Sequence, residues 1–147
     1  MGVRGMTNAE IPNDEGCPNA KARTENGHPE HKRPYDLEER TALFGENVIE
    51  YLKGIPVTPI TKSLIDQLVR SATSIGANYC EADDSGTKKE FRHRISICKR
   101  ESRESKHWLR MIAKAIPEKK ESARHLWQEA KELNLIFSAI FRGRKKP

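Results

Sequence analysis

The sequence contains no long apolar run, and its N-terminal region has no apolar segment. A helix that spans a bilayer needs roughly 20 predominantly apolar residues, and a secretory signal peptide needs an apolar stretch near the N-terminus. We therefore expect an intracellular, cytoplasmic protein that has no membrane partner.

Cysteine is scarce. The three cysteines, Cys17, Cys80 and Cys98, are an odd number without CxxC spacing and without paired histidines nearby. This pattern argues against a disulfide framework and against a zinc site. The histidines likewise form no pattern that supports a nucleophile and base pair. We expect no catalytic residues and no cofactor.

Two ExxH motifs, Glu90 to His93 and Glu104 to His107, are the only pattern that suggests a di-iron bundle. That site requires its ExxH motifs on different helices, together with a facing Glu from each of the other two. Here both motifs fall in one predicted helix, about 21 Å apart, among cations that repel a metal ion. We expect no metal site and no enzyme; a bundle metalloenzyme would instead carry iron or zinc after purification.

Hydrophobic residues make up 35% of the chain and charged residues 33%, a balance typical of amphipathic helices that each bury a single stripe. The formal net charge is +6. Residues 1–35 contain five basic and five acidic residues, so the whole excess lies further along the chain. A basic surface favours polyanionic partners, although a charge of this size also simply keeps a protein soluble.

The chain divides into three segments. Residues 1–34 have few large apolar side chains and are interrupted by Pro, Gly and Asn, so we predict a disordered N-terminal tail. Residues 35–142 form the predicted helical domain, and residues 143–147 form a basic C-terminal tail.

Helix boundary signals divide the domain into four helices. Capping patterns begin at Asp36, Thr58 and Thr87, and Pro117 suits the first position of a fourth helix. Apolar residues in each helix recur at alternating steps of four and three. Four amphipathic helices with short loops predict an all-α fold, an antiparallel up-down-up-down four-helix bundle. The buried seam predicted for the third helix consists of Phe91, Ile95, Cys98, Ser102, Ser105, Leu109, Ile112 and Ile116.

The third helix also carries a second ladder of basic residues, which we call the basic stripe: Lys89, Arg92, Lys99, Arg103, Lys106 and Arg110. We place it about 200° from the buried seam, so that its side chains point outward together. Its length of roughly 30 Å suits a phosphate backbone. The alternative is a solvated face partly paired with acidic residues of neighbouring helices. No aromatic residues alternate with these charges, so base stacking has little support.

Two segments, SATSIGANYCEA from Ser71 and KKEFRHRISICKRESRESKHWL from Lys88, closely resemble the bacterial four helix bundle proteins known as 23S rRNA intervening sequence proteins. The resemblance extends to DLEERT at Asp36 and to the IFSAIFRG ending, so it covers the helical domain and leaves out the tail. This chain departs from the pattern in its long tail and in Cys80 and Cys98. The most specific positions are Arg70, Ser71, Ala72, Ser74, Ile75, Ala77, Asn78, Glu81 and Ala82.

The resemblance implies a four-helix protomer that assembles into a ring-like homopentamer and has no established catalytic activity. The family looks related to accessory variability determinant proteins of diversity-generating retroelements, which are basic pentamers that bind nucleic acid and a reverse transcriptase. We therefore expect a non-enzymatic oligomer whose basic stripe contacts RNA or DNA phosphates. The alternative is an interaction scaffold that engages a protein partner, such as a reverse transcriptase, while its basic face is merely solvated.

Overall fold

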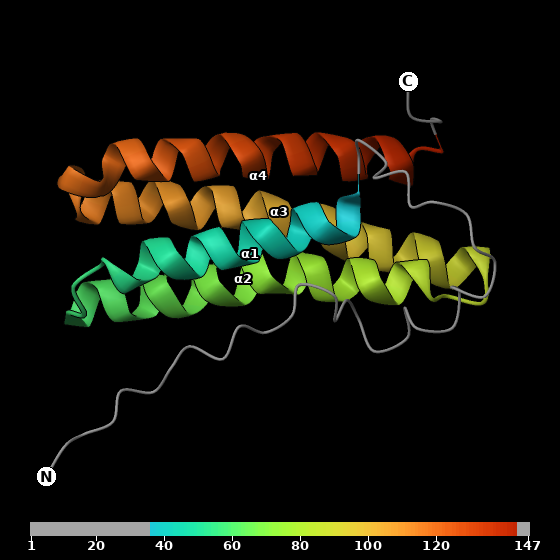
Figure 1. The fold of residues 1–147 in the computed structure, drawn as a ribbon, viewed down its shortest axis with the longest axis horizontal. Helices are drawn as coiled ribbons and strands as arrows, with labels where there is room; N and C mark the ends of the chain where they lie inside the picture. Colours follow the sequence, from blue (N-terminus) through green and yellow to red (C-terminus); the bar gives the residue numbers. More distant parts are fainter. Residues whose placement is uncertain (1–35, 144–147) are drawn as a thin grey trace, which may run out of the picture. The chain divides into compact units, whose positions relative to one another are not determined.

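The computed structural model describes residues 36–143. Within this range the chain forms α1 (Leu37–Lys53), α2 (Pro59–Asp83), α3 (Lys88–Ala115) and α4 (Lys120–Phe141), with a 3-10 turn, η2 (Pro117–Lys119), before α4. The described residues contain no strand, and the four helices pack side by side as a bundle (Figure 1). The all-α, four-helix prediction is confirmed. The predicted disordered tail, residues 1–34, and residues 144–147 of the C-terminal tail lie outside the described residues.

Three helices begin at the predicted capping residues. The Asp36 carboxylate accepts hydrogen bonds from the backbone N–H groups of Glu38 and Glu39, and the Thr87 hydroxyl accepts one from Glu90. Such bonds satisfy N–H groups that have no partner inside the helix. At Thr58 the cap is reciprocal, because the Thr61 hydroxyl accepts in turn from the Thr58 backbone.

The fourth helix starts later than predicted. Pro117 opens η2 instead of the α-helix, and α4 begins at Lys120 without a side-chain cap. Ile116, which precedes the proline, is extended with ψ 82°. Because a proline disfavours the α conformation in the residue before it, α3 ends at Ala115, and the turn that follows Pro117 is 3-10 before the chain continues as α4.

A single apolar core runs between the helices. α3 packs closely against both α2 and α4, whereas α1 packs mainly against α2 (Figure 1). The largest fully buried apolar side chains are Phe44, Val48, Leu68, Ile75, Ile95, Leu109, Ile112, Leu133 and Phe137. Most predicted seam positions are therefore buried as expected.

Two members of the predicted third-helix seam are not buried: Phe91 is 37% exposed, and Ile116 is half-buried and lies just beyond α3. α1 has 17 residues, against 25 in α2 and 28 in α3. In Figure 1 the ends of α2 and α3 joined by the 84–87 loop extend past the start of α1. Phe91 is the fourth residue of α3 and lines a surface hollow together with residues of the 84–87 loop.

Polar residues on the seams are hydrogen-bonded between helices, as buried polar groups require. The buried hydroxyls of Ser71 in α2 and Ser105 in α3 lie 3.0 Å apart. One of them donates to the other, and each also has a backbone carbonyl within reach. This network joins the two helices through the core.

Candidate nucleic-acid interface

The basic stripe flanks the buried seam and does not oppose it. Lys99 directly follows the buried Cys98, and Arg110 directly follows the buried Leu109. One residue of an α-helix corresponds to about 100°, so the predicted offset of about 200° was wrong. Lys99 and Lys106 are consequently half-buried, and the exposed members of the stripe are Lys89, Arg92, Arg103 and Arg110.

Two aromatic rings of α4 lie against the half of the stripe that faces this helix. The guanidinium carbon of Arg92 is 4.2 Å from the ring centre of Phe141, and Nζ of Lys99 is 5.3 Å from the same centre. Nζ of Lys106 is 5.5 Å from the ring centre of Trp127. A cation is attracted to the face of an aromatic ring without losing its charge, so these contacts hold the side chains while they remain cationic.

These rings are not apparent from the pattern of the third helix, because they belong to another helix. Trp127 and Phe141 are 14 residues apart in α4, which is close to four helical turns, so both occupy one face. That spacing is the signal that could have revealed that the two rings share a face. Whether this face of α4 lies against α3 depends on how the helices pack.

No member of the basic stripe forms an ion pair with a carboxylate among residues 36–143. The two arginines of α3 outside the stripe do have such partners, because Arg94 lies 3.9 Å from Glu81 and Arg100 lies 4.0 Å from Glu101. Within residues 36–143, the partial pairing with acidic residues of neighbouring helices that the alternative expects is therefore absent from these six side chains. A merely solvated face stays the alternative prediction.

Two of the three acidic residues of α3, Glu101 and Glu104, are engaged on its other side. Arg70 of α2 binds Glu104 at 2.8 Å and Glu101 at 3.4 Å. Glu101 is 5% exposed, and this burial raises the pKa of its carboxyl while Arg70 opposes the rise. The helix thus carries these two carboxylates toward α2 and the stripe cations toward α4 and solvent.

Asn134 of α4 joins the two helices near the middle of the stripe. Its amide donates to the backbone oxygen of Lys99 at 2.7 Å and to the hydroxyl of Ser102 at 3.2 Å. These bonds fix the position of α4 relative to the basic stripe.

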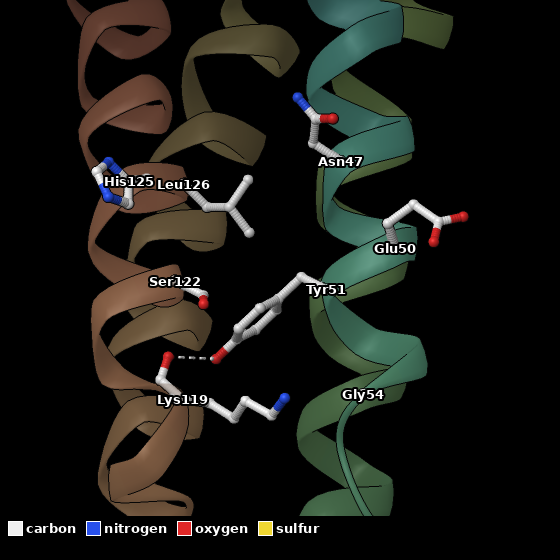
Figure 2. A pocket seen from close by; sticks show the side chains of 8 residues that line it. All are labelled: Asn47, Glu50, Tyr51, Gly54, Lys119, Ser122, His125 and Leu126. Carbon is white, nitrogen blue, oxygen red and sulfur yellow. Dashed lines mark hydrogen bonds between the residues drawn. The ribbon is translucent and has the colours of Figure 1, made fainter.

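A separate, open hollow of about 500 Å³ lies between α1 and the start of α4. Figure 2 shows Tyr51 reaching across it, where the hydroxyl donates to the backbone oxygen of Lys119 at 3.4 Å. Burial raises the pKa of Tyr51, so the phenol stays protonated near neutral pH. His125, which also lines the hollow, makes no hydrogen bond or ion pair within residues 36–143. The hollow therefore offers no hydrogen-bonded pair of nucleophile and base.

Neither a metal cluster nor a membrane span is found in the described part of the chain. No group of three or more His, Cys, Asp and Glu side chains there is placed to hold a metal ion. Glu104, from one of the two ExxH motifs, is bound by Arg70. None of the helices between residues 36 and 143 is long and apolar enough to cross a bilayer.

The family model of the 23S rRNA-intervening sequence proteins matches residues 36–139. This chain belongs to that family. All six residues of the basic stripe lie within the matched region, as does Trp127, whereas Phe141 lies just beyond it. No curated protein matches the chain.

A solved structure agrees with the family's helical fold. It is a protein of unknown function from the S23 ribosomal protein family of Bacteroides thetaiotaomicron, which is 21% identical to this chain with a TM-score of 0.62. The match covers 72% of this chain and 98% of that one. At this identity the likeness supports the fold and carries no function.

Proposed function

We propose that this protein is a non-enzymatic, cytoplasmic nucleic-acid-binding protein whose basic stripe contacts the phosphate backbone of RNA or DNA. The observation that carries the proposal is the absence, within residues 36–143, of any carboxylate paired with the six stripe cations. The α3 carboxylates Glu101 and Glu104 are bound by Arg70 on the side toward α2. No ion pair between a stripe cation and a carboxylate of residues 36–143 therefore has to be broken when phosphates reach the stripe.

Family membership supports an RNA-related role, because the family is described by an intervening sequence of 23S rRNA. The stripe is roughly 30 Å long, enough for several phosphates along one strand. Lys and Arg contacts to phosphates give affinity and orientation without reading the base sequence. We therefore expect binding with little sequence preference.

The protomer is proposed to be an antiparallel up-down-up-down bundle. Supporting evidence comes from the partners across α2 and α3. Arg70 contacts Glu104, whereas Asn78, further along α2, contacts Arg94, which is earlier in α3. This reversed order is what two antiparallel neighbours produce.

Assembly into a homopentamer is proposed from the resemblance to ring-forming relatives. A ring would repeat the basic stripe once in each protomer. Linked sites act on one nucleic acid at a high effective concentration, so weak contacts of each protomer would combine into tight binding.

The second candidate is a scaffold that binds a protein partner, such as a reverse transcriptase. It is favoured by two apolar residues near the start of α2, Val57 and Ile60, which are 74% and 71% exposed. A partner that covers them would remove apolar surface from water.

The test reverses three exposed stripe residues that contact no aromatic ring, namely Lys89, Arg103 and Arg110, to Glu. Affinity for RNA and DNA is measured across a range of salt concentrations. For wild type we expect a steep fall with salt, because each neutralised phosphate adds about 0.9 to the logarithmic slope for duplex DNA and about 0.7 for single strands. The reversed variant should show a slope flatter by at least about two units.

The matched control reverses Lys53, Lys62 and Lys120 to Glu, which changes the net charge equally at exposed positions outside the stripe. This control should keep the wild-type slope. Equal slopes in all three proteins would contradict the assignment of the stripe. No binding by the wild type at low salt would favour the scaffold.

A further inference from the structure

We infer that α4 completes the phosphate-binding face: Trp127 and Phe141 act as positioning residues beneath the stripe cations, and Lys131 is a seventh phosphate-binding cation. This inference rests on the proposed function and extends it to a second helix. It also assigns the rings a role other than base stacking.

The first observation is a pair of lysines that share one ring. Nζ of Lys106 is 5.5 Å from the ring centre of Trp127, and Nζ of Lys131 is 5.7 Å from it. Neither lysine has an ion-pair partner among residues 36–143. Each lysine therefore keeps its positive charge, with no carboxylate of the described range competing for it. Each can bind a phosphate oxygen.

The second observation is the same arrangement at the far end of α4. Arg92 and Lys99 both lie over Phe141, at 4.2 Å and 5.3 Å from its centre, and they too lack a carboxylate partner in the described range. The two rings are about 21 Å apart along the helix. Phosphates of one strand in duplex DNA are 3.4 Å apart along the axis, so one backbone can cross both clusters.

The rings are placed as supports. Each is half-buried and lies within 6 Å of two cationic groups. A stacking platform, by contrast, presents an open face to an unpaired base. Long Lys and Arg side chains lose rotamer freedom when they bind, and a ring that already holds them reduces that loss. Removing the ring should therefore weaken binding to paired and unpaired nucleic acids alike.

The ring test replaces Trp127 by Leu and measures affinity for a duplex RNA of about 20 base pairs, a length that exceeds both clusters, and for an unpaired oligouridylate of equal length. We expect a loss of a few fold for both ligands with an unchanged salt slope. Trp127→Phe keeps a ring and should restore most of the affinity. Phe91→Leu is the matched control, because Phe91 is a partly exposed aromatic residue over which no cation lies in the described structure. Thermal melting confirms that each variant is folded.

The charge test replaces Lys131 by Gln. We expect the logarithmic salt slope to fall by about one. The control, Lys62→Gln, removes an exposed lysine of α2 and should leave the slope unchanged.

Three outcomes overturn the inference. A loss in Trp127→Leu that is at least about tenfold larger for the unpaired ligand would identify stacking. The second outcome is that Trp127→Leu and Lys131→Gln both keep the wild-type affinity and salt slope, while the triple reversal of the stripe weakens binding. The stripe would then be the phosphate-binding site, and α4 would have no part in it. A wild-type protein that binds neither ligand would end both this inference and the proposed function.

Discussion

Cys98 shows how strongly the bundle controls a single side chain. Its thiol is fully buried in the α3 seam and donates to the backbone oxygen of Ile75 at 3.5 Å. Burial raises the pKa of Cys98 from 9.0 to about 12. Since the thiolate is the nucleophilic form, this cysteine is a packing residue and not a reactive one.

The raised pKa of Cys98 predicts a loss of stability in alkali. Between pH 9 and 12 the unfolded thiol ionises while the folded thiol keeps its proton, so rising pH favours the unfolded chain. At pH 10.5 the effect is about 2 kcal/mol relative to pH 8. Urea unfolding of wild type and Cys98→Ala at both pH values measures it, because the variant lacks this loss. A constant difference in unfolding free energy between the two proteins would contradict the prediction.

Glu101 is the corresponding case for an acidic side chain. Burial raises the pKa of its carboxyl, so the folded state holds this proton more tightly than the unfolded state does. The stability contributed by Glu101 is therefore present at low pH and is lost as the pH rises through the folded pKa.

We predict that Glu101→Gln gains stability relative to wild type as the pH rises from 4 to 7. The amide cannot ionise, and Arg70 keeps its 2.8 Å contact with Glu104, so the substitution leaves no uncompensated charge. Urea unfolding at both pH values tests this. Glu104→Gln is the control, because Glu104 is more exposed. A falling relative stability of Glu101→Gln would refute the prediction.

Among the helices, α3 and α4 depend on Asn134 for their polar connection. We predict that Asn134→Ala lowers the free energy of unfolding by about 1–2 kcal/mol, since the Ser102 hydroxyl and the Lys99 carbonyl lose a donor in a partly buried setting. Denaturant unfolding measures the change. Asn47→Ala, at an exposed position of α1, should alter stability by less than about 0.5 kcal/mol. Equal effects of the two substitutions would show that the interhelical bonds add nothing.

The same helices show which features can be read from sequence. Caps at Asp36, Thr58 and Thr87 are local, because the side chain and the N–H groups it binds are two or three residues apart. The seams follow from the helical repeat. The start of α4 was misplaced because the turn after Pro117 is 3-10, and a proline suits the first turn of either kind of helix. Phe91 was misjudged because the helical repeat does not tell which neighbouring helices cover a seam position.

For the interface, sequence identifies the six cations but not their surroundings. The angle of the stripe from the seam follows from the one-residue step between them, whereas only the packed structure shows that this flank faces α4. Its contacts with Trp127 and Phe141 depend on the relative position of two helices. That position is set by core packing and by the Asn134 bonds, which no local pattern encodes.

At the scale of the whole molecule, the net charge of +6 is less informative than the way in which acidic and basic side chains are distributed over the helices. Arg40 of α1 binds Glu129 and Glu132 of α4, and Arg70 of α2 binds two carboxylates of α3. These four acidic residues are thus used for pairing between helices, while the stripe cations on the face formed by α3 and α4 have no carboxylate partner within residues 36–143. A field of one sign on one face speeds encounter with a polyanion.

Assembly and the length of the bound nucleic acid are linked. If the chain forms a homopentamer, sedimentation or native mass spectrometry should give five times the 16.8 kDa chain mass. Such a ring should bind a duplex that reaches two stripes at least about 100-fold more tightly than one that reaches a single stripe, because the second contact is intramolecular. A monomer gains only in proportion to the number of sites on the longer duplex. Affinities for duplexes of about 10 and 40 base pairs, measured at one salt concentration because the slope depends on salt, therefore separate the two states. A gain of only a few fold would count against a ring that engages nucleic acid through several protomers, even if the sedimented mass is that of a pentamer.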